Sequence, residues 1–415
     1  MKKISARCFL SAATLVTAAV AIAPAPQLDA RPHNGLGNYV QLLDAMLGNP
    51  GYDWNSMPGW YFNNTSSISF GVMGNLPALT SAGEVSGILR QLDSPHYVKP
   101  LAQRRREVDA FYGTETGSLD GRHPAQRGEW QTYAFGQWNF GDFDSSRNRP
   151  VCNPETWGGL VGAHRWIDDE RLIGASVSYN FARAKLHDGG GRIDGGDTRL
   201  RLYAALVPEG RPWWVAFGAS GGYVSYKTIR LQADPFGPLG IETDPNYVAK
   251  ASPTGYEVGV FAALNTRIHI SENLLLTPVA RVDYNSTSMK RFTESGAQFA
   301  WNVNRFNSDS VQTRLGAGLE FNADAGWFLL KAGCTVAWAS ELAGNDIKIT
   351  SAFANYPGSK HYTYAGQLFQ DAVEINPSVS IVFKNGIVLE GAWNLQITFD
   401  AQFSQSVSGS IGWRF

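Results

Sequence analysis

The chain contains residue types that support catalysis or cofactor binding, but the spacings that such chemistry needs are missing. It has no GxSxG nucleophile turn, no HExxH helix and no phosphate-binding loop with its Lys. The glycine-rich run GGGRIDGG at 189–196 lacks a strand-to-helix context, so we expect a flexible surface loop there. Four histidines are scattered without ligand spacing: His164, His187, His269 and His361. We therefore expect no enzymatic activity, no cofactor and no metal site.

Charged and polar side chains instead recur at alternate positions of long runs. In 311–321 apolar residues alternate with Gln, Arg, Gly and Glu, and the same pattern returns in 328–338 and 373–383. This period of two is typical of strands with one apolar and one polar face. Eight charged residues of the polar faces are candidates to line a pore, either as a transport path or as ion pairs in a hydrated lumen: Arg199, Arg201, Arg281, Asp283, Arg314, Glu320, Lys331 and Glu390.

Connection lengths indicate what kind of β-protein this is. Tight turns, such as those at 208–210 and 384–386, alternate with mostly long connections, such as 187–197, 228–254 and 340–372. Short turns on one rim and long loops on the other are typical of an outer-membrane β-barrel, whose outer face meets lipid. Closure of the sheet satisfies every backbone group that lipid cannot. We predict an all-β, antiparallel transmembrane barrel of about twelve strands, near 129–140, 156–166, 171–186, 198–207, 212–227, 255–270, 274–286, 309–321, 327–339, 373–383, 387–399 and 404–415.

The amino-terminal residues predict export. Lys2 and Lys3 precede a small-residue apolar run over 9–23, which is too short to span a bilayer and reads as a signal peptide, 1–30. The chain has 35 basic and 36 acidic residues, so its charge predicts no nucleic-acid partner. Beyond the signal peptide only Cys152 and Cys334 remain, and their spacing leaves open whether they pair.

The region between signal peptide and barrel has a different periodicity. Helical patterns cover 36–47, 84–92 and 97–112, with a loop rich in Asn, Ser and Gly after the first. The third pattern carries Arg104, Arg105 and Arg106, which form either a solvated helix face or a basic helix inside a polar pore. We divide this region into a short amino-terminal segment, 31–80, and a helical linker, 81–128, ahead of the barrel at 129–415.

Aromatic residues fall near the predicted strand ends. Interfacial girdles of a barrel need aromatic side chains at these places. The last strand ends in Trp413 and Phe415, which resemble the carboxyl-terminal signal by which outer-membrane proteins engage their assembly machinery. The tryptophans expected in girdles are Trp130, Trp138, Trp166, Trp213, Trp214 and Trp413, with Trp338 near an opposite rim.

Several motifs in order resemble the translocator β-domain of the autotransporters, the type V secretion proteins. They are TPVARVDYNSTSMKRFTESGA at 277–297, TRLGAGLEF at 313–321, WASEL at 338–342 and GWRF at 412–415. The resemblance covers roughly 129–415, and residues 86–111 more weakly resemble the region that precedes the barrel in this family. It implies a barrel in the outer membrane of a Gram-negative-type bacterium, with a helix threaded through its pore. It also implies that the barrel carries an amino-terminal passenger to the cell surface. The partners it implies are outer-membrane lipid, the barrel-assembly machinery and periplasmic chaperones, and the chain is expected to be a monomer.

The chain departs from this family pattern before the barrel. Only about 97 residues lie between the signal peptide and the barrel, which leaves no room for a long β-helical passenger. Some family members cut themselves between adjacent Asn residues in the pore, but the pair Asn63-Asn64 has a loop-like context that argues against this. Three hypotheses follow: a barrel that displays its short amino-terminal segment, a passengerless pore or structural surface barrel, and a secreted soluble protein that binds glycans through its tryptophans.

Overall fold

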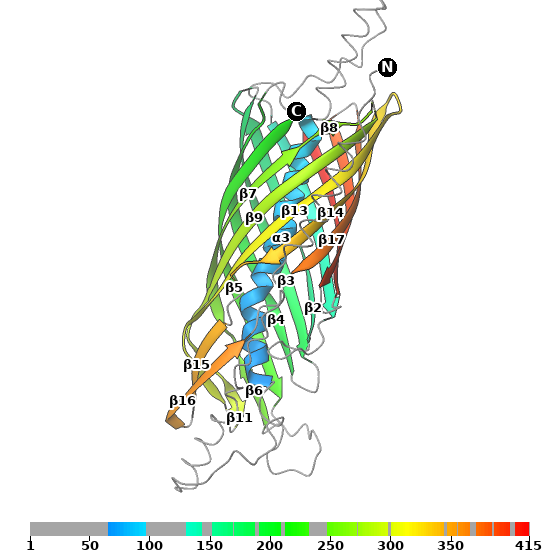
Figure 1. The fold of residues 1–415 in the computed structure, drawn as a ribbon. Coiled ribbons are helices and arrows are strands. Elements are labelled where there is room, and N and C mark those ends of the chain that lie inside the picture. Colours follow the sequence, from blue (N-terminus) through cyan, green and yellow to red (C-terminus); the bar gives the residue numbers. More distant parts are fainter. Residues whose placement is uncertain are drawn as a thin grey trace, which may run out of the picture. The chain divides into compact units, whose positions relative to one another are not determined.

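A closed ring of twelve long antiparallel strands forms the body of the protein (Figure 1). The structure is a computed structural model that describes residues 65–96, 130–142, 152–168, 170–186, 191–208, 212–231, 247–271, 273–297, 300–343, 347–354, 356–365, 371–383, 386–398 and 403–414. The ring contains β1 (Trp130–Asp142), β2 (Cys152–Trp166), β3 (Arg171–Leu186), β4 (Gly191–Leu206), β5 (Trp213–Leu231), β7 (Thr254–Thr266), β9 (Leu274–Met289), β13 (Phe306–Asp324), β14 (Phe328–Glu341), β17 (Ala372–Phe383), β18 (Ile387–Thr398) and β19 (Phe403–Arg414).

The first and last strands close the ring. β1 pairs with β19 from Gln131 opposite Arg414 to Asp142 opposite Phe403, and every other neighbour follows chain order. Each of the twelve predicted strands overlaps one strand of this ring, so the predicted strand number and antiparallel order are confirmed. Because the ring is closed, every one of its twelve strands pairs along both edges. Lipid cannot hydrogen-bond to free backbone groups, so a sheet must be closed in this way to span a membrane.

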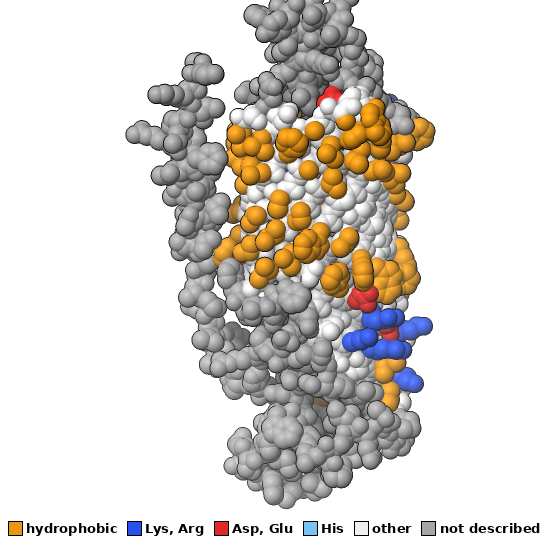
Figure 2. Space-filling view, turned by 90° about the vertical axis from the view of Figure 1, so that its right-hand side faces the viewer, with side chains coloured by type: hydrophobic (Ala, Val, Ile, Leu, Met, Phe, Trp, Pro, Cys, Tyr) orange, Lys and Arg blue, Asp and Glu red, His pale blue; other side chains and the backbone are white. Residues whose placement is uncertain are grey.

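The two faces of the wall are chemically opposite. Leu315 and Leu319 on β13 are 59% and 51% exposed on the outside, whereas Gln312 on the same strand is 5% exposed and faces inward. Figure 2 shows apolar side chains spread over the outer face of the described strands. The alternation in the sequence thus sorts apolar residues to the outer face and polar residues to the lumen.

The two rims differ in their connections. We call the turn rim the end that carries the beginning of β1 and the end of β19, with turns at 167–170, 207–212, 325–327 and 384–386. The opposite end, the loop rim, carries most of the short additional strands. These are β6 (Tyr247–Ala251), β10 (Phe292–Thr293), β11 (Ser295–Ala297), β12 (Trp301–Val303), β15 (Ile347–Phe353) and β16 (Tyr356–Ala365), whereas β8 (Ile268–His269) lies at the turn rim.

The glycine-rich run at 189–196 was expected to be a surface loop, and this expectation is wrong for 191–196, which begin β4. The reason is close strand contact. A Cβ on Gly195 would lie 2.2 Å from the carbonyl oxygen of Ser225, and one on Gly196 would lie 2.0 Å from that of Asn180. These glycines allow β3, β4 and β5 to approach each other, and the β3–β4 connection shrinks to 187–190.

In the described part of the chain before the barrel, one helix runs through the lumen: α3 (Thr65–His96), drawn in blue in Figure 1. It includes the predicted helix at 84–92 but begins about twenty residues earlier, where a loop had been expected. The sequence hides it because Gly, Ser and Pro77 interrupt the helical pattern. The Pro77 carbonyl accepts a hydrogen bond of 3.1 Å from Arg199 of the wall and another of 3.0 Å from the Thr80 hydroxyl of α3 itself. In the described residues, no helix is both long and apolar enough to cross a membrane.

The structure corrects the expectation for two girdle tryptophans and answers whether the two cysteines pair, and several other predicted features lie outside the described residues. Trp166 and Trp214 do not belong to an interfacial girdle, because they are only 2% and 3% exposed and point into the lumen. Cys152 is buried and Cys334 is exposed on the outer face, and the two do not form a disulfide. The signal peptide, the helices at 36–47 and 97–112, the Asn63-Asn64 pair and Phe415 lie outside the described residues.

Candidate functional site

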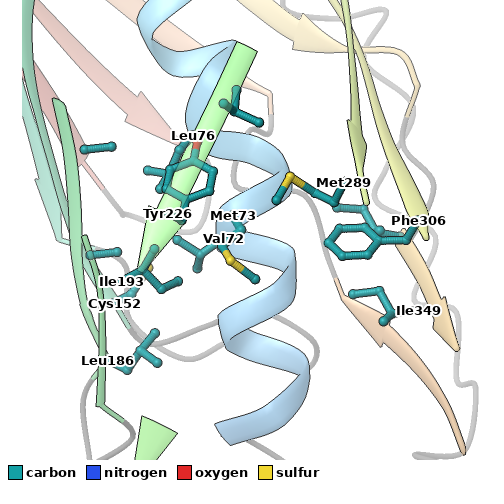
Figure 3. Packing of buried hydrophobic residues seen from close by; sticks show 14 of the residues in the cluster. Val72, Met73, Leu76, Cys152, Leu186, Ile193, Tyr226, Met289, Phe306 and Ile349 are labelled. Atoms are coloured by element: carbon teal, nitrogen blue, oxygen red, sulfur yellow. The ribbon is translucent and has the colours of Figure 1, made fainter. Parts of the chain in front are cut away.

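The lumen around α3 is the candidate functional site, and it is organised in levels along the barrel axis. At the loop rim Val72, Met73 and Leu76 of α3 pack into an apolar cluster with residues of β2–β5, β9, β13 and β15. Figure 3 shows Tyr226 on one side of this helix segment and Met289 on the other. We call this group the loop-rim cluster: Val72, Met73, Leu76, Cys152, Ala182, Ala184, Leu186, Ile193, Val224, Tyr226, Met289, Val303, Phe306, Ile347 and Ile349.

A second apolar cluster lies toward the turn rim, where Val85, Ile88 and Leu92 of α3 meet inward-facing aromatic residues. Within this cluster the hydroxyl groups of Tyr133 and Tyr203 form a hydrogen bond, with 2.8 Å between their oxygen atoms. The turn-rim cluster consists of Val85, Ile88, Leu92, Tyr133, Phe135, Leu160, Trp166, Leu172, Tyr203, Ala205, Trp214, Ala216 and Phe261. The helix is therefore in apolar contact with the barrel at both ends of the lumen.

An ion cluster lies between the two apolar clusters, centred on Glu84 of α3. Its Oε2 atom lies 2.7 Å from Nη1 of Arg199 and 3.0 Å from Nη1 of Arg201, both on β4. Oε1 accepts a hydrogen bond of 2.6 Å from the Asn180 amide. The side chains of Glu84 and Arg199 are each 1% exposed. A carboxylate removed from water in this way is stable only when several donors surround it.

The barrel wall supplies two further carboxylates to this cluster. Glu257 on β7 lies 2.7 Å from the Arg199 guanidinium. Asp197 lies 3.4 Å from the same guanidinium and accepts a hydrogen bond of 3.1 Å from Thr80 of α3. Arg201 also donates a hydrogen bond of 2.9 Å to the Ser81 hydroxyl of α3. The helix thus contributes the Glu84 carboxylate, two hydroxyls and the Pro77 carbonyl to a network that it shares with the wall.

A second charged group lies beside the helix on β9, β13 and β17. Arg281 donates hydrogen bonds to the Ser86 hydroxyl at 2.7 Å and to the Ala82 carbonyl at 2.9 Å. Its Nε atom also lies 2.6 Å from Asp283, which Arg314 contacts from the other side at 2.8 Å. Glu374 contacts Arg314 in turn at 3.1 Å. Arg281 therefore connects α3 to a chain of alternating charges along the wall.

Further polar contacts hold the carboxyl-terminal half of α3. Gln91 donates a hydrogen bond of 2.8 Å to Glu390 and Arg90 donates one of 2.9 Å to Ser408. Glu320 and Lys331 lie 3.7 Å apart on neighbouring strands of the wall. With the contacts above, these complete the positions of the eight candidate residues: Arg199, Arg201, Arg281 and Glu390 contact α3, whereas Asp283, Arg314, Glu320 and Lys331 contact other wall residues.

Two glycines let the helix lie close to β1. A Cβ on Gly83 would come within 1.9 Å of Oε1 of Gln137, and one on Gly87 would come within 2.7 Å of the Phe135 ring. Any larger residue at Gly87 would have to displace a buried aromatic ring. The side of α3 that carries Gly83 and Gly87 thus faces β1, while the Glu84 side chain faces β4.

A polar gap remains beside α3 on the side of β17, β18 and β19. It has a volume of about 60 Å³, which is room for on the order of four waters at about 15 Å³ each. Its wall includes Asn376, Asn394 and Ser406.

Sequence reasoning missed Glu84, Asp197, Glu257 and Glu374 as partners of the candidate arginines. Glu257 and Glu374 were visible on polar strand faces, but α3 gave no sign that Glu84 would be buried among arginines. No group of His, Cys, Asp and Glu in the described part of the chain has a geometry that could hold a metal ion.

Comparisons with known proteins bear on both the fold and the family. The sequence model of the autotransporter β-domain matches residues 132–394. The translocator domain of the autotransporter NalP from Neisseria meningitidis is similar in structure, with a TM-score of 0.53 and 14% identity over 78% of this chain and 98% of that one. The β-domain of the Bordetella autotransporter Brka gives a TM-score of 0.48 and 14% identity over 68% and 98%.

No curated protein sequence matches the chain significantly. The likeness to the NalP domain bears on the fold alone, because the two chains are 14% identical. The family match extends over more than half of the chain and over nearly all of the ring, from β1 to β18. The chain therefore belongs to the autotransporter β-domain family, and its barrel is an outer-membrane translocator barrel of a Gram-negative bacterium.

Proposed function

We propose that this barrel displays its amino-terminal segment at the cell surface, with α3 as the part of the chain that stays in the pore. The direction of α3 carries this proposal. Its early residues Val72 and Met73 belong to the loop-rim cluster, whereas Ile88 and Leu92 belong to the turn-rim cluster. The chain thus runs through the lumen from the loop rim to the turn rim.

The rims can be assigned to the two sides of the membrane. Short turns and both ends of an outer-membrane barrel lie in the periplasm, and longer loops lie outside. The beginning of α3 therefore faces the cell exterior, and the residues that precede Thr65 start from that side. This direction of α3 supports display of the segment that precedes it.

The contacts of α3 support a retained helix rather than an open conduit. Two apolar clusters and the ion cluster around Glu84 and Arg199 hold it over most of its length. We expect the boundary between displayed segment and pore segment near Thr65, rather than at residue 80, which falls within α3. We further propose that the barrel is a monomer, inserted with the help of periplasmic chaperones and the barrel-assembly machinery.

Surface display is tested with an epitope tag inserted after Asn34 in the full chain, followed by protease treatment of intact cells. Fractionation confirms that the barrel is in the outer membrane, and a soluble periplasmic protein serves as the lysis control. We expect intact cells to lose the tag while the periplasmic control survives. A tag that protease reaches only after the outer membrane is opened would refute display and leave a passengerless pore or structural barrel.

A further inference from the structure

A group of cations gathers on the outer face of β3–β6 near the loop rim. Figure 2 shows basic side chains collected there, beyond the apolar bands of the outer wall. The members are exposed and alternate with buried residues such as Ala184 and Ile193. We call this group the basic cluster: Arg183, Lys185, Arg192, Lys227 and Lys250.

Strand pairing makes the cluster continuous across neighbouring strands. Lys185 is opposite Arg192, Arg183 is opposite Asp194, and Asp194 is opposite Lys227. Directly opposed side chains on one face of a sheet lie about 5 Å apart. Lys250 joins the row of Lys185 and Arg192, because Ile229 is opposite both Arg192 and Lys250. The five cations therefore form one surface rather than separate charges.

The cluster begins where the aromatic belt ends. Along β3 the exposed Tyr179 and Phe181 come directly before Arg183 in the outward alternation, and along β5 the exposed Tyr223 comes before Lys227 with one Ser between them. The Arg183 guanidinium carbon lies 5.8 Å from the centre of the Trp157 ring. Because Trp and Tyr mark the boundary between hydrocarbon and headgroups, the cluster lies at the depth of the lipid headgroups on the loop-rim side.

The local carboxylates orient this surface without neutralising it. Asp194 contacts Nε of Arg183 and Nε of Arg192, each at 2.9 Å. These contacts use the Nε atoms of two exposed side chains. The paired terminal nitrogens of a guanidinium group match the oxygens of a phosphate. Among the described residues, Glu155 is another carboxylate beside Arg183, and it accepts a hydrogen bond of 3.1 Å from Trp138.

We propose that the basic cluster binds the phosphorylated headgroup of a glycolipid in the outer leaflet of the membrane. A lipid fits better than a soluble anion, because the cluster directly continues the aromatic belt and a bound lipid would also place its chains on the apolar wall below it. Basic groups at headgroup depth attract anionic lipid in the same way on other membrane proteins. The proposal concerns the lipid-facing surface and is independent of what the lumen transports.

The test measures binding of purified lipopolysaccharide to the full chain in zwitterionic detergent. The cluster variant is Lys185→Gln with Lys227→Gln, in which both altered side chains are exposed. The control variant is Arg165→Gln with Arg171→Gln at the turn rim, where Arg165 lies 5.7 Å from the Trp130 ring in a similar Arg-over-Trp arrangement. Heat-modifiable mobility in electrophoresis verifies that both variants are folded.

We expect binding to weaken roughly thirtyfold in the cluster variant, which lacks two lysine charges, and to remain unchanged in the control. Removal of the phosphates from the lipopolysaccharide should weaken its binding to the unaltered protein. Equal binding by the folded cluster variant, or equal binding of the dephosphorylated lipid, would overturn the proposal. Competition by inorganic phosphate at the concentration of the lipid would also overturn it, since that result indicates a site for a free anion.

Discussion

Glu84 on α3 and Arg199 on β4 lie 2.7 Å apart in the middle of the barrel, although 115 residues separate them in the chain. This ion pair connects the helix to the barrel wall, and both side chains are buried. Neither residue could be buried alone, because an unpaired charge in such surroundings is unstable. The wall and the helix therefore depend on each other at this point.

Replacing Glu84 by Ala should loosen α3 in the lumen. Loss of one partner from a buried ion pair costs about 3–5 kcal/mol, since the remaining arginines stay buried without their carboxylate. We expect a higher single-channel conductance in planar bilayers than for the unaltered protein. Glu155→Ala, which removes a carboxylate from the outer face, is the control. A conductance as low as that of the unaltered protein would show that Glu84 does not hold the helix.

The facing of β13 predicts an asymmetry between two neighbouring residues. Leu319→Arg places a charge on the lipid face, at a cost of about 2 to 4 kcal/mol near the bilayer midplane, and should reduce the folded barrel in the outer membrane. Glu320→Arg faces the lumen and should be better tolerated. Because Glu320 lies 3.7 Å from Lys331, Glu320→Gln is a companion that avoids placing two cations together. Heat-modifiable mobility measures the folded fraction, and equal amounts for all three variants would contradict the assigned facing.

Close packing at Gly87 predicts that even a methyl group disturbs the helix. Gly87→Ala should gain about 1 kcal/mol of helix propensity, so any loss must come from contact with the Phe135 ring, 2.7 Å from the new Cβ. We expect faster proteolysis of α3 in the purified protein. Phe135→Leu should restore protection in the double variant.

Gly136→Ala is the matched control for this packing effect, because the nearest atom to its new Cβ is 3.9 Å away. Protease resistance of Gly87→Ala equal to that of the unaltered protein would show that the wall yields at Phe135.

Labelling of Cys152 reports on whether the helix is in place. Cys152 is buried in the loop-rim cluster beside Val72 and Met73, whereas Cys334 faces the lipid side of β14. In a Cys334→Ala background, a water-soluble maleimide should label Cys152 slowly in the unaltered lumen and quickly after Glu84→Ala. Denatured protein gives the full-labelling control. Rapid labelling of Cys152 with α3 intact would mean that water already reaches the loop-rim cluster.

The wall of the barrel could be predicted because its signal is local. Each strand alternates with period two, so the outward position of Leu319 and the inward position of Gln312 follow from the neighbouring residues. The run at 189–196 is the exception, because only the approach of β3 and β5 shows that its glycines belong to a strand. The prediction that Trp166 and Trp214 lie in an interfacial girdle was wrong for a related reason. A position near a strand end does not show whether a side chain points to lipid or to the lumen.

The sequence by itself determined an outer-membrane barrel of about twelve antiparallel strands with an apolar outer face and a polar inner face. It could do so because the alternation of apolar and polar residues and the lengths of the connections are properties of single segments. Only the tertiary structure decided that α3 begins at Thr65, that Glu84 pairs with Arg199 and that Gly87 meets Phe135. A helix inside a polar barrel has no water-facing side and no single apolar stripe. Its pattern therefore becomes readable only when the wall around it is known.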